Sequence, residues 1–370
     1  MGLTLYFIGA GLTKSLERTR PVPLIGDFVQ VLTHYVYDKV VLDTLVGMEV
    51  GRVHETACDE CLELATALRK RGQVTDEERG RFAALVRGRP SESIEAIFKR
   101  VESMSPETPG FEIASGLRPA YFRYAINQVF STIGWDLKLD LLTRFLARQF
   151  EDDHNAHVFV SFNYDLALDR AVEIASGGTW QPRDGYGFEF PFYHDGATER
   201  CTAELAPGSP RIRILKPHGS LNWLRRRPNG VMLADGGIDA PHMVIPLKMI
   251  PPNNWELRYW PSPDQFREEI VIAPPSPTKP SIIPRLRDAE IDAVTKADEV
   301  LVIGYSMPTT DEDQWNLIKD AVTARSAAIP KLTIINCNSR PEYFQRIWSL
   351  FRPQCVCTFN HGFAEFSARG

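Results

Sequence analysis

Short apolar runs alternate with helical stretches along much of this chain, and this alternation narrows the possible folds sharply. The first run, residues 3–10, is continuously apolar, as in strands buried on both faces, and further strand signals lie at 156–165, 211–220, 268–275, 298–306 and 331–338. Helical spacing follows at 166–175 and 311–327. The pattern predicts an α/β fold with a doubly wound, mostly parallel Rossmann-like sheet, whose ligands bind beyond the carboxyl ends of the strands.

The sequence pattern changes in the segment 31–150, where apolar residues recur at helical spacing over most of the length. Thr75 followed by Glu78 forms a capping-box pattern at the start of one such helix. We therefore expect a helical insertion at 31–150 inside a discontinuous Rossmann-like domain made of residues 1–30 and 151–370. Residues 241–284 hold eleven of the 27 prolines and two tryptophans, which favours a long ordered loop or a binding surface.

Composition excludes several classes of protein. Hydrophobic residues make up 44% and charged residues 24% of the chain, so neither a disordered nor a membrane protein is indicated. A net charge of -5, scattered along the sequence, gives no argument for nucleic-acid binding. The first residues carry no basic segment of the kind that begins a signal peptide, so we expect a cytoplasmic protein with free thiols.

One helical face could hold a metal. His54, Cys58 and Cys61 recur at the spacing of a single helical face, which could supply three ligands. The same face continues through Ala65 and Leu68, and buried cysteine is a common small core residue. A core face is the favoured interpretation, and no metal is expected.

A second histidine pair, His154 and His157, lies in a polar run before a strand. Metal ligands need a fixed geometry that such a run does not supply, so a solvated loop is the favoured interpretation.

The first strand runs into the turn "GAG". Gly9 and Gly11 leave room for backbone amides and a helix N-terminus to approach a pyrophosphate. Lys14 stands where the third glycine of a dinucleotide fingerprint would be. An ordinary tight turn between a strand and a helix remains an open alternative.

Polar residues follow the next strands at their carboxyl ends. Asn163 can orient a ribose hydroxyl or a water, because a carboxamide donates and accepts hydrogen bonds at once. Asp165 is placed to cap the following helix, whatever else it does. His218 follows a strand and precedes a glycine that allows a ligand to come close, although a lone histidine is usually a satisfied polar group.

Two later strands end in the same way. Gly304 and Ser306 leave room for a phosphate or ribose, and Asn336 is suited to adenosine hydroxyls. The stretch "TTDEDQW" that follows has the pattern of a helix N-cap with an acidic first turn.

Taken in order, these motifs resemble those of the sirtuin family, and more closely its divergent bacterial branch of NAD-hydrolysing proteins. The likeness covers residues 1–30 and about 155–365. The similar segments are "GAGLT" at 9–13, with Thr13 in place of the family's serine, "GDF" at 26–28, "FNYD" at 162–165, "PHG" at 217–219 and "GYSMP" at 304–308.

This sequence departs from the sirtuin family at positions that distinguish two activities, removal of acyl groups and hydrolysis of NAD. Sirtuins that remove acyl groups carry a four-cysteine zinc module after the catalytic histidine, whereas no cysteine lies between 202 and 336 here. Val29 stands where those enzymes place an arginine, and their Phe-Gly-Glu substrate motif is absent. The resemblance therefore implies hydrolysis of NAD, in this branch often a defence against phage that depletes the host cofactor.

The resemblance also implies residue roles. The catalytic group would be Asn163, His218 and Asp165, and the residues that bind NAD would be Gly9, Ala10, Gly11, Thr13, Asp27, Phe28, Gly304, Ser306 and Asn336. An NAD-dependent protein deacylase and a sensor that binds NAD or an ADP-ribose derivative without turnover are the alternatives. Because unregulated NAD hydrolysis poisons a cell, we expect a homo-oligomer or a regulatory partner such as an ATPase or an Argonaute-like protein.

Overall fold

The structure is a computed structural model. It describes residues 2–19, 21–24, 26–35, 41–42, 45, 59–71, 74–87, 107, 129–130, 136–152, 154–190, 192–194, 199–201, 211–226, 243–244, 268–272, 284–337 and 340–369.

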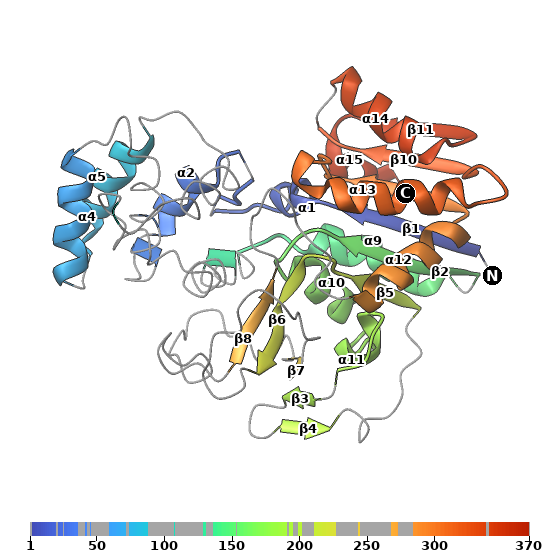
Figure 1. The fold of residues 1–370 in the computed structure, drawn as a ribbon, viewed down its shortest axis with the longest axis horizontal. Helices are drawn as coiled ribbons and strands as arrows, with labels where there is room; N and C mark the ends of the chain where they lie inside the picture. The colour runs from blue at the N-terminus through green and yellow to red at the C-terminus, as the bar shows by residue number, and fades with distance from the viewer. Residues whose placement is uncertain are drawn as a thin grey trace.

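The main element of the fold is a six-stranded parallel sheet (Figure 1). Its strand order is β5-β2-β1-β9-β10-β11. The strands are β1 (Gly2–Ile8), β2 (Asn155–Ser161), β5 (Ile212–Leu215), β9 (Glu299–Ile303), β10 (Lys331–Ile335) and β11 (Cys355–Phe359). Every neighbouring pair is parallel, which confirms the predicted Rossmann-like α/β fold.

The strand order reverses beside β1. From β1 the chain moves outward through β2 and β5, and it later returns to β9 on the other side of β1 before moving out through β10 and β11. Ligands of open α/β sheets bind at such a switch point, beyond the carboxyl ends of the strands. The turns after β1 and β9 lie there.

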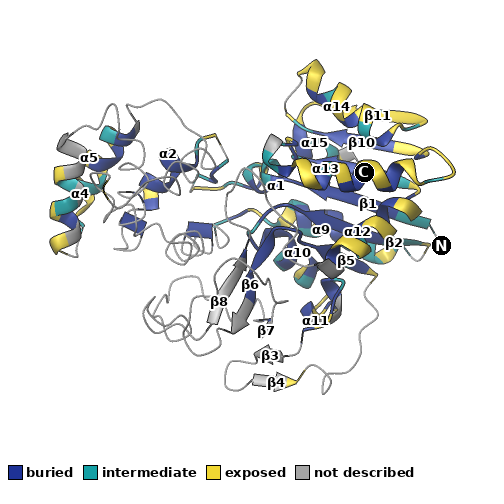
Figure 2. Ribbon diagram, in the orientation of Figure 1, coloured by how far each residue is buried: buried dark blue, intermediate teal, exposed yellow. Residues whose placement is uncertain are grey.

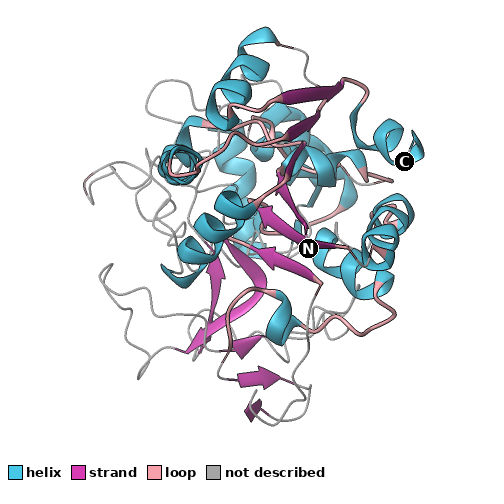
Figure 3. Ribbon diagram, turned by 90° about the vertical axis from the view of Figure 1, so that its right-hand side faces the viewer, coloured by secondary structure: helices cyan, strands magenta, loops and turns pink. Residues whose placement is uncertain are grey.

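Helices cover both faces of this sheet (Figure 3). One layer holds α1 (Ala10–Ser15), α9 (Asp140–Glu151), α10 (Ala167–Ala175) and α15 (Gly362–Arg369), which are linked by contacts of α9 with α10 and α15 and of α1 with α15. The other holds α12 (Pro284–Lys296), α13 (Glu312–Thr323) and α14 (Pro341–Phe351). The central strands are buried between the layers, as their continuous apolar sequences require (Figure 2).

A second, smaller sheet was not foreseen from the sequence. Its order is β4-β3-β7-β6-β8, and its strands are β3 (Phe192–His194), β4 (Glu199–Cys201), β6 (Gly219–Arg226), β7 (Met243–Val244) and β8 (Glu268–Ile272). The apolar run 268–275 does contain a strand, but β8 pairs antiparallel with β6 and not with the parallel sheet. Gly219, with φ of 84°, turns the chain from β5 directly into β6 instead of into a helix. The short helix α11 (Pro182–Gly185) precedes β3.

Most of the described residues from 28 to 151 are helical, and five helices in this range have described bounds. These are α2 (Phe28–Leu32), the 3₁₀ helix η1 (Thr33–Tyr35), α4 (Asp59–Arg71), α5 (Asp76–Arg87) and α9. The capping box before α5 is confirmed, because Thr75 N donates to Glu78 Oε2 at 3.0 Å and Glu78 N donates to Thr75 Oγ1 at 3.3 Å. Much of 88–135 lies outside the described residues, as does most of 241–284, so the domain division and the loop stay predictions.

In the part of the chain that the structure describes, no helix is both long and apolar enough to cross a membrane.

Candidate functional site

The turns after β1 and β9 pack backbone against backbone at the switch point. Gly9 N donates to Ile303 O at 3.1 Å and Gly11 N donates to Gly304 O at 2.9 Å. A Cβ at Gly9 would overlap the Tyr305 backbone, and one at Gly11 would lie 2.8 Å from Gly304 Cα. These glycines are therefore required by the contact between the two turns, and their amides bond protein carbonyls.

Gly304 completes this contact from the β9 side. Its φ of 59° lies in the left-handed region, and a Cβ there would overlap the backbone of Leu12. The residue in the place of a third glycine, Lys14, forms an ion pair with Glu17 at 2.5 Å on the partly exposed side of α1. Contacts within the protein thus hold the turn that leads into α1.

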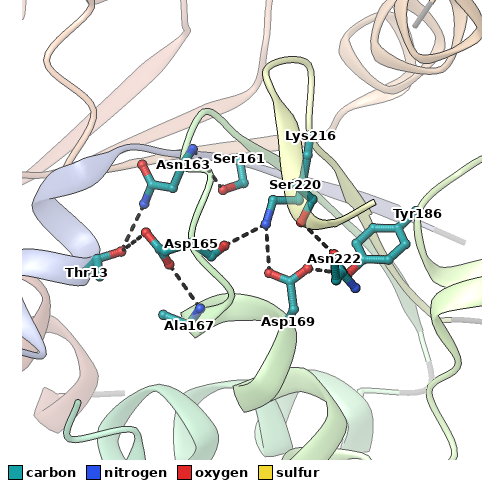
Figure 4. Close-up of polar contacts among 10 residues, drawn as sticks. All are labelled: Thr13, Ser161, Asn163, Asp165, Ala167, Asp169, Tyr186, Lys216, Ser220 and Asn222. Carbon is teal, nitrogen blue, oxygen red and sulfur yellow. Dashed lines mark hydrogen bonds and ion pairs between the residues drawn. The ribbon is translucent and has the colours of Figure 1, made fainter. Parts of the chain in front are cut away.

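Three predicted site residues meet directly beneath this turn (Figure 4). Asn163 Nδ2 donates to Thr13 Oγ1 and to Gly9 O, both at 3.1 Å. Thr13 Oγ1 donates to Asp165 Oδ2 at 2.9 Å. All three side chains are at least nine-tenths buried. The ends of β1 and β2 thus bring Thr13, Asn163 and Asp165 into one hydrogen-bonded cluster.

The N-cap of α10 is Leu166 and not Asp165, but the Asp165 carboxylate still satisfies the first amide of the helix. Ala167 N donates to Asp165 Oδ1 at 3.0 Å. Burial raises the pKa of the Asp165 carboxyl, and the Lys216 ammonium, the Ala167 amide and the Thr13 hydroxyl oppose that rise. The carboxyl therefore holds the end of β2, the start of α10 and Thr13 together.

A buried lysine that no motif in the sequence indicates links this cluster to the next strand end. Lys216 Nζ donates to Asp165 O at 2.6 Å and to Asp169 Oδ2 at 3.1 Å, and the Lys216 side chain has no exposed surface. Asp169 Oδ1 accepts from Tyr186 OH at 2.5 Å. The network continues with Asn222 Nδ2, which donates to Tyr186 OH at 3.0 Å (Figure 4).

His218 lies in the turn between β5 and β6, beside Asn163. Its Nδ1 is 3.3 Å from Phe162 O, the carbonyl of the residue before Asn163. Its Nε2 is 3.5 Å from Asp311 Oδ1, and the edge of the ring contacts Phe162, with centroids 5.3 Å apart. His218 is 1% exposed. The predicted histidine thus lies next to the predicted asparagine segment.

Asp311 is the second residue that was not recognised as part of the site. The sequence predicted an N-cap, and Asp311 does occupy that position at α13, but its carboxylate makes no side-chain cap bond. Instead Oδ1 faces His218 and Oδ2 accepts from Tyr305 OH at 2.8 Å. No local sequence pattern separates these two uses of an aspartate.

Unsatisfied polar atoms lie next to Asp311 in sequence. Gln314 is 3% exposed, and neither its Oε1 nor Thr310 Oγ1 has a hydrogen-bond partner among the described residues. Buried polar atoms in folded proteins are nearly always paired, so atoms of this kind are available to a ligand or water.

The remaining predicted residues lie around this centre or apart from it. Ala10 begins α1, and Ser306 is exposed in the loop after β9. Asn336 follows β10 and its backbone amide donates to Phe359 O at 3.1 Å. Asp27 Oδ1 accepts from Leu24 N at 2.6 Å, and Phe28 packs near Phe130 with ring centroids 6.3 Å apart. These contacts of Asp27 and Phe28 lie near the start of the helical segment and not in the Thr13 cluster.

The residues considered as metal ligands fall in two parts of the chain, and the structure describes only some of them. His54 and Cys58 lie outside the described residues, as does the side chain of Cys61. His157 is buried in β2 with Nδ1 3.1 Å from Tyr6 OH, so the expectation of a solvated loop is wrong for it. Among the residues described here, no group of three or more His, Cys, Asp or Glu side chains could hold a metal ion.

Comparisons with models of known protein families and with curated protein sequences find no match for this chain.

Proposed function

We propose that this chain is a sirtuin-like NAD⁺ hydrolase that cleaves the bond between nicotinamide and ribose. The observation that carries the proposal is the hydrogen-bonded cluster of Thr13, Asn163 and Asp165 beside the switch point of a Rossmann-like parallel sheet, with His218 against the carbonyl of Phe162, the residue before Asn163. Dinucleotides bind at this position in such sheets. These side chains are the ones to which the proposal assigns the reaction.

Cleavage of the bond between nicotinamide and ribose requires few catalytic groups from the protein. Water adds to C1′ of the ribose, the glycosidic bond breaks, and nicotinamide leaves as a neutral molecule, so no strong acid is needed. The transition state resembles an oxocarbenium ion, and catalysis requires a fixed ribose, a polar group near C1′ and a group that accepts the proton of water. ADP-ribose, nicotinamide and one proton are the products.

The named residues supply these functions in the proposal. Asn163 orients the ribose or the water, since a carboxamide both donates and accepts. His218 accepts the proton, directly or through a ribose hydroxyl. Asp165 holds Thr13 and the end of β2 in place, and this agrees with its position in the hydrogen-bonded cluster.

NAD would lie across the switch point. In the proposal Gly9, Ala10, Gly11 and Thr13 line the pyrophosphate, with Asp27 and Phe28 nearby, and Gly304, Ser306 and Asn336 face the adenosine half. Because the amides of Gly9 and Gly11 bond protein carbonyls, the pyrophosphate would contact the outer side of this turn. His218 is 1% exposed, so the substrate requires the surrounding side chains to move apart.

This buried arrangement agrees with an enzyme that is inactive until it is triggered. We propose that the protein acts in the cytoplasm as a regulated defence effector that depletes NAD. Its trigger would act through self-association or through a partner such as an ATPase or an Argonaute-like protein.

The proposal is tested by incubating pure protein with NAD⁺ over a wide range of protein concentration, with and without an acylated peptide. Free nicotinamide without peptide is the expected result. Turnover only with the peptide would assign a deacylase instead, and binding of NAD without turnover would assign a sensor. Absence of NAD binding would contradict the proposal and both alternatives.

A further inference from the structure

Two buried side chains face each other across the switch point. His218 comes from the turn after β5, and Asp311 comes from the 3₁₀ helix η7 (Thr309–Asp311), in the loop after β9. His218 Nε2 and Asp311 Oδ1 are 3.5 Å apart, and both side chains are 2% exposed. The pair therefore joins two segments that lie on opposite sides of β1 in the sheet.

We propose that Asp311 is the positioning residue of His218, fixing the orientation of the imidazole and stabilising its protonated form. The proposal rests on the proposed function in one respect, namely that His218 accepts a proton during NAD cleavage.

Asp311 is itself held in place by aromatic residues. Tyr305 OH donates to Asp311 Oδ2 at 2.8 Å, and Trp315 Nε1 donates to Tyr305 OH at 3.2 Å. The Tyr305 ring stacks on Phe162 with centroids 4.1 Å apart, and Tyr343 OH donates to Tyr305 O at 2.5 Å. These contacts leave Oδ1 directed at the imidazole.

Phe162 connects both halves of this arrangement. Its carbonyl is 3.3 Å from His218 Nδ1, its ring contacts the imidazole edge-on, and it stacks on Tyr305. The two ring nitrogens of His218 thus face two acceptors, a carbonyl and a carboxylate. A neutral imidazole carries one N–H and can satisfy only one acceptor, whereas an imidazolium carries two.

With the single N–H of the neutral ring on Nε2, facing Asp311, Nδ1 is the nitrogen that takes up the proton, and the imidazolium that forms can then donate to Phe162 O. A carboxylate plays the same part beside the histidine of a Ser-His-Asp triad, where it orients the ring and stabilises the imidazolium. The phenol ring of Tyr164 also faces the imidazole, with centroids 6.4 Å apart, and the charged side chains at the neighbouring ends of β2 and β5 have other partners. Asp165 is bound by Thr13 and Ala167 N, and Lys216 is paired with Asp169, so Asp311 is the charge that contacts the ring.

The test is a titration of His218 by NMR in protein labelled with ¹⁵N-histidine. The His218 signals among the eight histidines are assigned from their loss in His218→Gln. Asp311→Asn keeps the size of the side chain and an oxygen that accepts from Tyr305. Asp313→Asn is the matched control, because Asp313 is an exposed acid in the first turn of α13.

We expect Asp311→Asn to lower the titration midpoint of His218 by about 1–3 units, the usual effect of an opposite charge 4–6 Å away. Asp313→Asn should leave the titration midpoint of His218 unchanged. An unchanged midpoint in Asp311→Asn would overturn the proposal. If that variant does not fold, Asp311→Ser is titrated in its place, and the same lowering of the His218 midpoint is expected because the carboxylate is again removed.

Kinetics separate this proposal from the proposed function. NAD cleavage by Asp311→Asn should fall roughly a hundredfold or more with NAD affinity little changed, and Asp311→Glu should recover part of the rate. If Asp311→Asn shifts the titration of His218 but still cleaves NAD at the wild-type rate, the positioning role is refuted. If the wild type does not cleave NAD at all, the proposed function fails, while the titration still decides whether Asp311 sets the charge of His218.

Discussion

Replacing Glu290 by glutamine should stabilise the protein, and more so as pH rises. Glu290 lies in α12 and is 2% exposed, and its Oε1 has no hydrogen-bond partner among the described residues. Burial raises the pKa of this carboxyl from its usual 4.5 to about 8, opposed only in part by Arg287. At neutral pH the folded protein therefore keeps a proton on Glu290 that the unfolded chain releases.

The sign and size of the effect follow from this difference in bound protons. Because the pKa is raised on folding, the stability present below pH 4.5 is lost as pH rises toward 8. Each unit corresponds to about 1.4 kcal/mol, so Glu290 costs about 3 kcal/mol at pH 7 and about 5 kcal/mol above pH 8. Glutamine resembles the neutral carboxyl and has no such dependence. For a chain of 370 residues, about 3 kcal/mol corresponds to roughly 4 °C in Tm.

Thermal unfolding of wild type and Glu290→Gln between pH 5 and pH 8.5 measures this effect. The two Tm values should be close at pH 5 and diverge with rising pH, with the variant higher. Asp288→Asn, which removes an exposed carboxylate from the same helix, is the control and should show no such divergence. A constant difference between wild type and Glu290→Gln across this range would refute the reasoning.

Two further predictions concern the site's framework. In urea denaturation, Lys216→Met should lower the free energy of unfolding by about 3–5 kcal/mol, because it leaves Asp169 buried without its cation. Combining Lys216→Met with Asp169→Leu should recover much of that loss. A double variant as unstable as the single one would contradict the pairing. Gly11→Ala should destabilise the fold by about 1–3 kcal/mol through its clash with Gly304, whereas Gly26→Ala, where a Cβ meets nothing within 4 Å, should stay within about 0.5 kcal/mol of wild type. Equal stability of the two alanine variants would show that the turns do not need this close contact.

The parallel sheet could be predicted because its strands carry their own signal. Burial on both faces requires continuous apolar runs, and such runs mark β1, β2, β9 and β10 in the sequence. β11 was missed because it is an edge strand, with Cys355 and Val356 exposed, so its sequence lacks that continuity. The second sheet was missed because several of its strands are only two to three residues long and pair with partners far along the chain.

Part of the candidate site could also be predicted, since residues at the carboxyl ends of adjacent parallel strands meet. This rule correctly places Asn163 beside Thr13, and His218 beside the carbonyl of Phe162, the residue before Asn163. It gives no information on Asp311, whose position before a helix indicates a cap, or on Lys216, whose partner Asp169 lies on α10. Both depend on which side chains the completed fold brings face to face.

The central claim is that Asn163 and His218 act on NAD held at the switch point, and the most direct measurement compares NAD binding with NAD cleavage in His218→Ala. Nicotinamide release should fall roughly a hundredfold or more while the dissociation constant for NAD stays near that of the wild type, because the variant loses a proton acceptor and not a binding surface. Cleavage at the wild-type rate in His218→Ala would contradict the assignment of His218 as the base.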